Sequence, residues 1–294
     1  MKLIPICMPA YNRPHYLREV LTALGKCECL DQFVVVASVE PGQPETVQVF
    51  KEAFERFPNK GLHTVSVNDT QLGCNGNVLH AMEHGFALTE APWAMCLEDD
   101  VVLARDALRW MIWANRVFGN QPDCFSVCAY QVQRFGQPVN YDDTGKSIFR
   151  GTILPWGWAI TQEKFQDARY WWDRQPEGRP GLWDDNLCYY MAQKMWYEVC
   201  PVVSRAQNIG AVGFNANANP FGYGSQQHWK EFQNVYGFIG DVQPDYPTPA
   251  TYEAFDQAHV GAFKRAYMRR RGIKPPNMGG TLVPIDRQGT NHGQ

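Results

Sequence analysis

Three acidic residues, Glu98, Asp99 and Asp100, stand side by side directly after the apolar run WAMCL. Burying even one carboxylate without a partner costs several kcal/mol, so three buried at the end of a strand would favour a nearby cation. Oxygen ligands of this kind suit Mg²⁺ or Mn²⁺, particularly when a phosphate supplies further ligands. The residues favour a divalent metal beside a phosphate group. A solvated turn before the next helix would explain the same acids without a metal.

A second acidic pair, Asp184 and Asp185, follows Trp183 where the sequence predicts the start of a helix. One carboxylate is enough to cap a helix N-terminus. A carboxylate beside a flat apolar ring can also act as a general base on a hydroxyl group. The pair therefore predicts either a catalytic base or a cap together with a solvent-exposed acid.

Alternating strands and helices in the first 130 residues must position these acids. The apolar periodicity predicts strands at 2–10, 31–39, 62–68 and 93–97, and helices at 13–25, 44–57, 76–89 and 105–119. This alternation predicts an α/β fold with a mainly parallel sheet and helices on both faces. Ligands of such sheets bind beyond the carboxyl ends of the strands. We therefore expect the loops after the strands to meet there, namely 9–14, 39–43, 68–77 and 98–101.

The remainder of the chain has a less regular pattern. It predicts a strand at 123–130, a loop at 133–147, an interrupted strand at 151–161, a short helix at 162–172, a turn, helix and strand within 181–203, a mobile loop at 205–225 and a last helix at 250–272. Neither GxGxxG nor GxxxxGK[ST] occurs, which excludes a standard Rossmann or P-loop domain.

Composition and charge add further expectations. The nine cysteines are scattered, several of them in apolar runs, which is typical of reduced buried thiols. With no leader-like segment and no apolar window of about 18 residues, we expect a soluble, cytoplasmic protein. The net charge is −3, but residues 257–285 contain six cations and no acid. That segment could meet a polyanion, or it could be the solvated end of a helix.

Several stretches, taken in order, resemble glycosyltransferases of the GT-A fold. More narrowly, the chain is similar to the N-acetylglucosaminyltransferase I family and its relative, the protein-O-mannose GlcNAc-transferase. The resemblance covers roughly residues 4–230, on the stretches YNRPHYLREVLTAL, VVASVEPGQPET, LGCNGNVLHAMEHGF, PWAMCLEDDVVLARD, GTILPWGWAI, LWDDNLCYYMAQK, CPVVSRAQNIG and SQQHWK. It implies an inverting enzyme that uses a UDP-sugar and Mn²⁺, or Mg²⁺ in its place.

The resemblance also implies contacts to the nucleotide. Arg13 would lie near the diphosphate, because its guanidinium can pair with phosphate oxygens. Glu40 occupies the position of an Asp that accepts a hydrogen bond from uracil N3–H, which a Glu can also do. A turn that passes close to the nucleotide would be formed by Gly73, Cys74, Asn75 and Gly76.

Roles around the sugar follow in the same way. The resemblance implies that Glu98 contacts the donor sugar, Asp99 the ribose and Asp100 the metal. Asp184 would be the catalytic base, with Trp183 forming a wall of the sugar pocket.

Two features depart from the family pattern. Trp156 stands where the family has a smaller apolar residue near the donor sugar, so the sugar could be GlcNAc, glucose or something smaller. The loop at 208–225 differs from the family's substrate-closing loop, although it could still fold over a bound donor.

The resemblance suggests a catalytic domain at residues 1–240. Residues 1–130 would bind the nucleotide-sugar, and 131–240 would supply the acceptor site and the base. Residues 241–294 would be a Pro-rich spacer, a basic helix and a polar tail. Because family members are anchored in the secretory pathway and this chain starts at the first strand, we expect a bacterial or viral enzyme.

The acceptor and two rival functions stay open at this point. The acceptor could be a glycan or other saccharide, or a hydroxylated base in phage-type DNA, which the basic segment at 264–274 would favour. A nucleotidyltransferase also uses acids and a metal on an α/β sheet, but it would normally carry a basic, Gly-rich loop near the first strand. A non-catalytic sugar-binding module is the other alternative.

Overall fold

The computed structural model describes residues 2–131, 140–174, 182–210 and 249–255, together with residues 260, 261 and 264. The chain divides into a large compact unit, residues 1–254, and a small one, residues 255–294. The predicted boundary between residues 240 and 241 lies outside the described ranges, as does most of the predicted basic helix.

Strands and helices alternate in the first half, as the sequence predicted. The strands are β1 (Ile4–Ala10), β2 (Phe33–Val39), β3 (Thr64–Val67), β4 (Trp93–Cys96), β5 (Val101–Leu103) and β6 (Cys124–Cys128), and the helices are α1 (Pro14–Leu24), α2 (Pro44–Phe54), α3 (Gly73–Thr89) and α4 (Ala107–Phe118). Helices α1 and α2 both begin at a proline, whose fixed φ suits the first helical position. The central strands β1 and β2 are buried almost throughout, which explains their continuous apolar runs.

The second half supplies the remaining elements. They are β7 (Ser147–Arg150), β8 (Trp158–Thr161), α5 (Gln162–Arg169), α6 (Trp183–Lys194), β9 (Tyr197–Pro201) and β10 (Ala206–Asn208), with short 3₁₀ helices at Leu30–Gln32 and Tyr141–Asp143.

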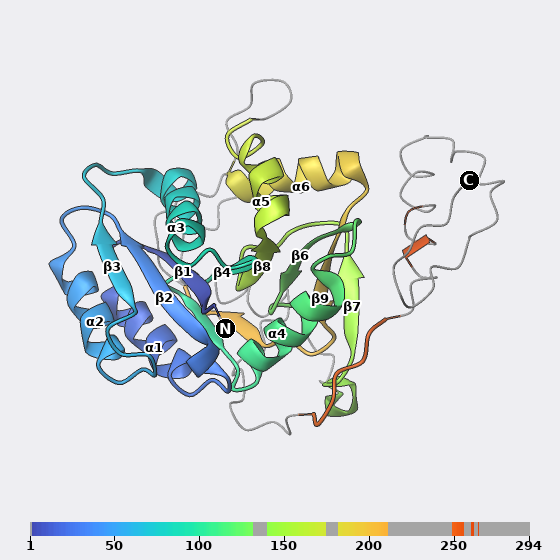
Figure 1. The fold of residues 1–294 in the computed structure, drawn as a ribbon, viewed down its shortest axis with the longest axis horizontal. Helices are drawn as coiled ribbons and strands as arrows, with labels where there is room; N and C mark the ends of the chain where they lie inside the picture. Colours follow the sequence, from blue (N-terminus) through green and yellow to red (C-terminus); the bar gives the residue numbers. More distant parts are fainter. Residues whose placement is uncertain are drawn as a thin grey trace, which may run out of the picture. The chain divides into compact units, whose positions relative to one another are not determined.

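An eight-stranded, mostly parallel sheet forms the centre of the large unit, which confirms the predicted α/β fold class. Its strand order is β3-β2-β1-β4-β8-β6-β9-β7. Strand β8 runs antiparallel to β4 and β6, and β7 runs antiparallel to β9. Helices cover both faces: α3, α5 and α6 lie above the sheet and α1, α2 and α4 below it in Figure 1.

The direction of winding reverses between β1 and β4. The chain runs outward from β1 through β2 to β3, and then returns through α3 to place β4 on the other side of β1. Right-handed crossovers put the helices of the outward and return paths on opposite faces. Loops after β1 and β4 diverge at such a point, and ligands of open α/β sheets bind there.

Three local predictions were wrong. Strand β10 lies within the predicted loop at 205–225 and pairs with the unpredicted strand β5. Described residues 250–255 are not helical. There the Tyr252 hydroxyl donates to Asp106, and Arg109 donates to the Tyr252 hydroxyl and the Pro249 carbonyl. Of the interrupted strand predicted at 151–161, only the part after the turn, Trp158–Thr161, is strand.

Two further observations concern the cysteines and the helices. All nine cysteines are free thiols, six of them buried. Among the described residues, no helix is both long enough and apolar enough to cross a membrane.

Candidate active site

Arg13 binds the acidic loop at the point where the winding reverses. It follows β1, while Asp99 and Asp100 follow β4, the neighbouring strand. One guanidinium nitrogen lies 2.5 Å from Asp100 and the other pairs with Asp99. The backbone N–H of Tyr11 also approaches Asp99, at 3.5 Å. The sheet therefore brings together the residues predicted for the diphosphate, the ribose and the metal.

Negative charge in this loop exceeds what Arg13 can offset. Asp99 and Asp100 are only 3% and 5% exposed, and Glu98 is half-buried. Burial raises the pKa of Asp100 to about 6, although Arg13 acts in the opposite direction. Burial, and then repulsion from Asp100, raise the pKa of Glu98 well above its ordinary value. A further cation would relieve this repulsion.

The donor set of the acidic loop fits a divalent ion that phosphate helps to hold. Within the described part of the chain, no group of three His, Cys, Asp or Glu residues is arranged around one metal position. Mg²⁺ is usually bound through one or two carboxylates together with substrate phosphates, so a complete protein cage is not required. Asp100 and Glu98 offer hard oxygen ligands, as Mg²⁺ and Mn²⁺ prefer.

Glu40 lies buried at the carboxyl end of β2, where it organises the next loop. Both of its carboxylate oxygens accept from the Leu72 N–H, at 3.1 and 3.0 Å, and Asn68 donates to it at 3.4 Å. Asn68 in turn donates to Asn77. Glu40 therefore fixes the entry to α3, and its contact with uracil stays a prediction.

Helix α3 begins at Gly73, so residues 73–76 form its first turn and not a turn before it. Gly73 has a φ of +70°, a left-handed conformation that favours glycine. The Asn75 side-chain oxygen accepts from the Trp183 N–H at 3.0 Å, and its carbonyl accepts from Trp172 Nε1 at 2.9 Å. Asn75 thus joins the start of α3 to the start of α6, a contact that the sequence did not predict.

Asp184 lies half-buried in the first turn of α6, next to the exposed Asp185. Burial, and then the charge of Asp185, raise the pKa of Asp184 to about 6. Asp184 is also near enough to contribute to the raised pKa of Glu98. The predicted base and the acidic loop are therefore electrostatic neighbours, although they are far apart in the sequence.

Trp183 stands in a stack of three buried indoles. Its ring centroid lies 4.9 Å from that of Trp172, with the planes 6° apart, and 5.2 Å from that of Trp158. Only 1% of Trp183 is exposed. The stack fixes the first residue of α6, while the role of Trp183 in a sugar pocket stays a prediction.

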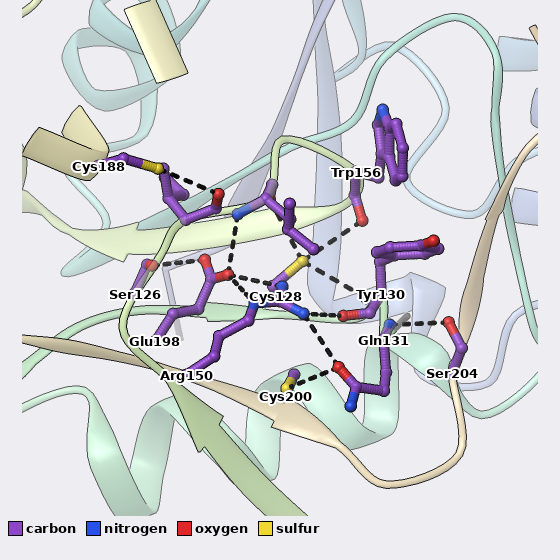
Figure 2. A network of polar contacts seen from close by, with 12 residues as sticks. Ser126, Cys128, Tyr130, Gln131, Arg150, Trp156, Cys188, Glu198, Cys200 and Ser204 are labelled. Carbon is purple, nitrogen blue, oxygen red and sulfur yellow. Dashed lines mark hydrogen bonds and ion pairs between the residues drawn. The ribbon is translucent and has the colours of Figure 1, made fainter. Parts of the chain in front are cut away.

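The segment that carries Trp156 is held by a buried ion pair (Figure 2). Glu198 of β9 accepts from Arg150 of β7, at 2.6 and 2.8 Å, and from the Leu154 N–H at 3.0 Å. The Cys128 thiol donates to the Leu154 and Trp156 carbonyls, at 3.4 and 3.5 Å. The half-buried Trp156 ring meets Tyr130 edge to face, with centroids 4.6 Å apart.

The sequence did not predict Asn75 as a link, the Arg150–Glu198 pair, or the position of Asn208 and Gly210 beside Asp100. For Asn75, the resemblance implies only a contact with the nucleotide. Each of the other contacts joins residues that are far apart in the chain, and no local pattern marks them.

The reversing α/β sheet, with acids and an arginine at its switch point, defines an open α/β fold with a candidate ligand site at the carboxyl ends of its strands. The family described as Glycosyltransferase like family 2 matches residues 4–165, more than half of the chain. The chain belongs to this family. No curated protein matches the sequence.

Solved structures to which the chain is similar include a mannosyltransferase and the protein TarS. Mannosyltransferase PcManGT from Pyrobaculum calidifontis, in complex with GDP-Man and Mn²⁺, is 15% identical with a TM-score of 0.47, over 68% of this chain and 55% of that one. S. aureus TarS 1-349 is 16% identical with a TM-score of 0.49, over 70% and 60%. The same TarS fragment with UDP is 13% identical with a TM-score of 0.49, over 92% and 72%.

Proposed function

We propose that the protein is a metal-dependent, inverting glycosyltransferase that moves a sugar from a UDP-sugar to an acceptor hydroxyl. The observation that carries the proposal is the meeting of Arg13, the acids at 98–100 and Asp184 at one edge of the sheet. The family membership supports sugar transfer, and the resemblance of the sequence to the GlcNAc-transferases supports UDP and inversion.

Asp184 is the proposed general base. A half-buried carboxylate with a pKa of about 6 is mostly ionised at neutral pH, yet it is a stronger base than an ordinary Asp. It removes the proton of the acceptor hydroxyl, and the oxygen attacks the anomeric carbon on the face opposite the leaving UDP. Inversion follows from this single displacement, which needs no covalent enzyme intermediate.

Arg13 and the acidic loop serve the donor. Asp100 would hold Mn²⁺ or Mg²⁺, which when bound offsets negative charge on the departing diphosphate, and Glu98 would contact the donor sugar. Arg13 exchanges its carboxylate partners for phosphate oxygens as the nucleotide binds. Asp99 then becomes available to the ribose, while Glu40 and Asn75 border the nucleotide.

We further propose a hexose or N-acetylhexosamine donor and a saccharide acceptor. The half-buried Trp156, packed on Tyr130, favours a compact sugar such as glucose, although GlcNAc belongs to the same proposal. The basic segment that would favour DNA lies outside the described residues except for Lys264, so a DNA acceptor is not proposed.

Donor binding is tested by thermal unfolding with a panel of nucleotide-sugars, with and without Mn²⁺. A ligand that binds only the folded state raises the unfolding temperature, so a UDP-sugar should do so in a metal-dependent way. Product analysis follows with the best donor. Free UDP and a glycoside of inverted configuration support the proposal, whereas pyrophosphate would indicate a nucleotidyltransferase, and unchanged donor a binding module.

The base is tested with Asp184→Asn and a matched control, Asp185→Asn. Loss of a general base should lower kcat by about 10² to 10⁴. Asp185 is its exposed neighbour on the same turn, so its replacement should leave kcat within a few-fold of wild type. Near-wild-type turnover by Asp184→Asn would show that another group is the base.

A further inference from the structure

Strand β10 lies along the strand that follows the acidic loop. It pairs with β5 antiparallel, with Asn208 opposite Val101. The Ile209 N–H donates to the Asp100 carbonyl at 2.8 Å. Because β5 begins immediately after Asp100, this pairing places residues 208–210 against the proposed metal residue.

Asn208 holds one side of the Asp100 carboxylate. The residue is only 4% exposed, and its Nδ2 lies 3.4 Å from Asp100 Oδ1. Its own Oδ1 accepts from the Gly210 N–H at 2.8 Å. With that oxygen engaged by a donor, the amide group directs its N–H toward the carboxylate.

Gly210 lies against the other oxygen. A Cβ at this position would collide with Asp100 Oδ2 and would lie 2.8 Å from its Cγ. The same Oδ2 is 2.5 Å from Arg13, so the carboxylate is enclosed by a guanidinium, an amide and a glycine. Any side chain at Gly210 would have to move the Asp100 carboxylate.

We propose that Asn208 and Gly210 are positioning residues that set the orientation in which Asp100 binds its divalent cation. This inference rests on the proposed function, because it takes Asp100 as a metal residue. Residues that orient a metal ligand typically contribute about 10- to 100-fold to metal affinity. We expect losses in that range when either residue is changed.

The test is a titration of Mn²⁺, followed by electron paramagnetic resonance, alone and with saturating UDP. The Gly210→Ala variant should bind Mn²⁺ about 10- to 100-fold more weakly, because turning the short Asp100 side chain is the easiest way to accommodate a new methyl group. Asn208→Ala should weaken Mn²⁺ in the same direction. A purely structural role would instead lower the unfolding temperature without ligand and leave the Mn²⁺ affinity of the folded variants at the wild-type value, so both quantities are measured.

Gly25→Ala is the matched control, since its new methyl group would meet the Phe57 ring at 3.1 Å, in a contact that does not involve the acidic loop. It should leave Mn²⁺ affinity unchanged.

If Gly210→Ala fails to fold, Asn208→Ala decides, because it only removes atoms. Wild-type affinity in the variants would overturn this inference alone. Failure of the wild-type protein to bind Mn²⁺, with or without UDP, would instead overturn the proposed metal dependence and this inference with it.

Discussion

At the scale of single residues, the raised pKa of Asp184 predicts how kcat depends on pH. Its pKa of about 6 lies above the ordinary Asp value, first because of burial and then because of Asp185. A base must be ionised, so kcat should be constant above pH 7 and should fall about tenfold per pH unit well below pH 6. The measurement is kcat against pH at saturating donor and Mn²⁺. Under these conditions Asp100 is bound to the metal, so its own titration does not add to the profile.

Replacing Asp185 separates the effect of its charge on the pKa of Asp184 from the effect of burial. Asp185→Asn removes a repulsive charge next to Asp184, so the midpoint of the pH profile should move to lower pH. A profile with no inflection between pH 5 and 7 in the wild-type enzyme would contradict the assignment of Asp184 as the titrating base.

At the scale of secondary-structure elements, Asn75 connects two helices. Leu182, at the N-cap position of α6, offers no side-chain cap, and the Asn75 oxygen accepts from the Trp183 N–H in its place. Losing an N-terminal cap typically costs about 1 kcal/mol, so Asn75→Ala should lower the free energy of unfolding by that order. Urea denaturation measures this cost.

Kinetics of the same variant separate two roles for Asn75. If it mainly positions α6, kcat should fall and the donor KM should change little. If it mainly contacts the nucleotide, the donor KM should rise. Asn75→Asp keeps the accepting oxygen and should retain most of the stability, whereas equal losses in both variants would exclude the capping role.

A second link between elements is the Arg150–Glu198 pair. Glu198 is fully buried and pairs with the Arg150 guanidinium at 2.6 Å. Its carboxylate also accepts hydrogen bonds from the Ser126 hydroxyl and the Leu154 N–H. Removing one partner of a buried ion pair typically costs about 3–5 kcal/mol, which is the loss expected for Glu198→Gln. The double variant Arg150→Met/Glu198→Gln should lose less than the two single changes added together, as a double-mutant cycle would measure.

Elements with a strong local signal could be predicted from the sequence, and elements made by distant pairing could not. Pro14 and Pro44 mark helix starts, and the unbroken apolar runs of β1 and β2 indicate buried strands. Strands β5 and β10 have three residues each and exist because they pair with each other. The acids and Arg13 could be found from residue type and resemblance. Asn208 and Gly210 could not, because their importance depends on where the chain returns.

At the scale of the whole molecule, one central sheet runs through both halves of the large unit. Strand β8 lies between β4 and β6, so the sheet crosses the division predicted near residue 130. A chain ending there would leave β4 and β6 without the strand that joins them, and buried backbone groups on both would lose their partners. We therefore expect the two halves to unfold together, even though they supply different parts of the proposed site.

Thiol labelling in increasing urea can test this cooperativity. Cys7 lies buried in β1 and Cys96 in β4, while Cys128 and Cys200 lie buried in β6 and β9. Each thiol reacts only when its strand opens, so all four should become reactive at one urea concentration, the midpoint seen by circular dichroism. Cys74, which is exposed in the folded protein, should react without urea and serves as the control. Earlier labelling of Cys200 than of Cys7 would show that the acceptor half opens by itself. The sheet would then join the halves in structure without coupling their stability.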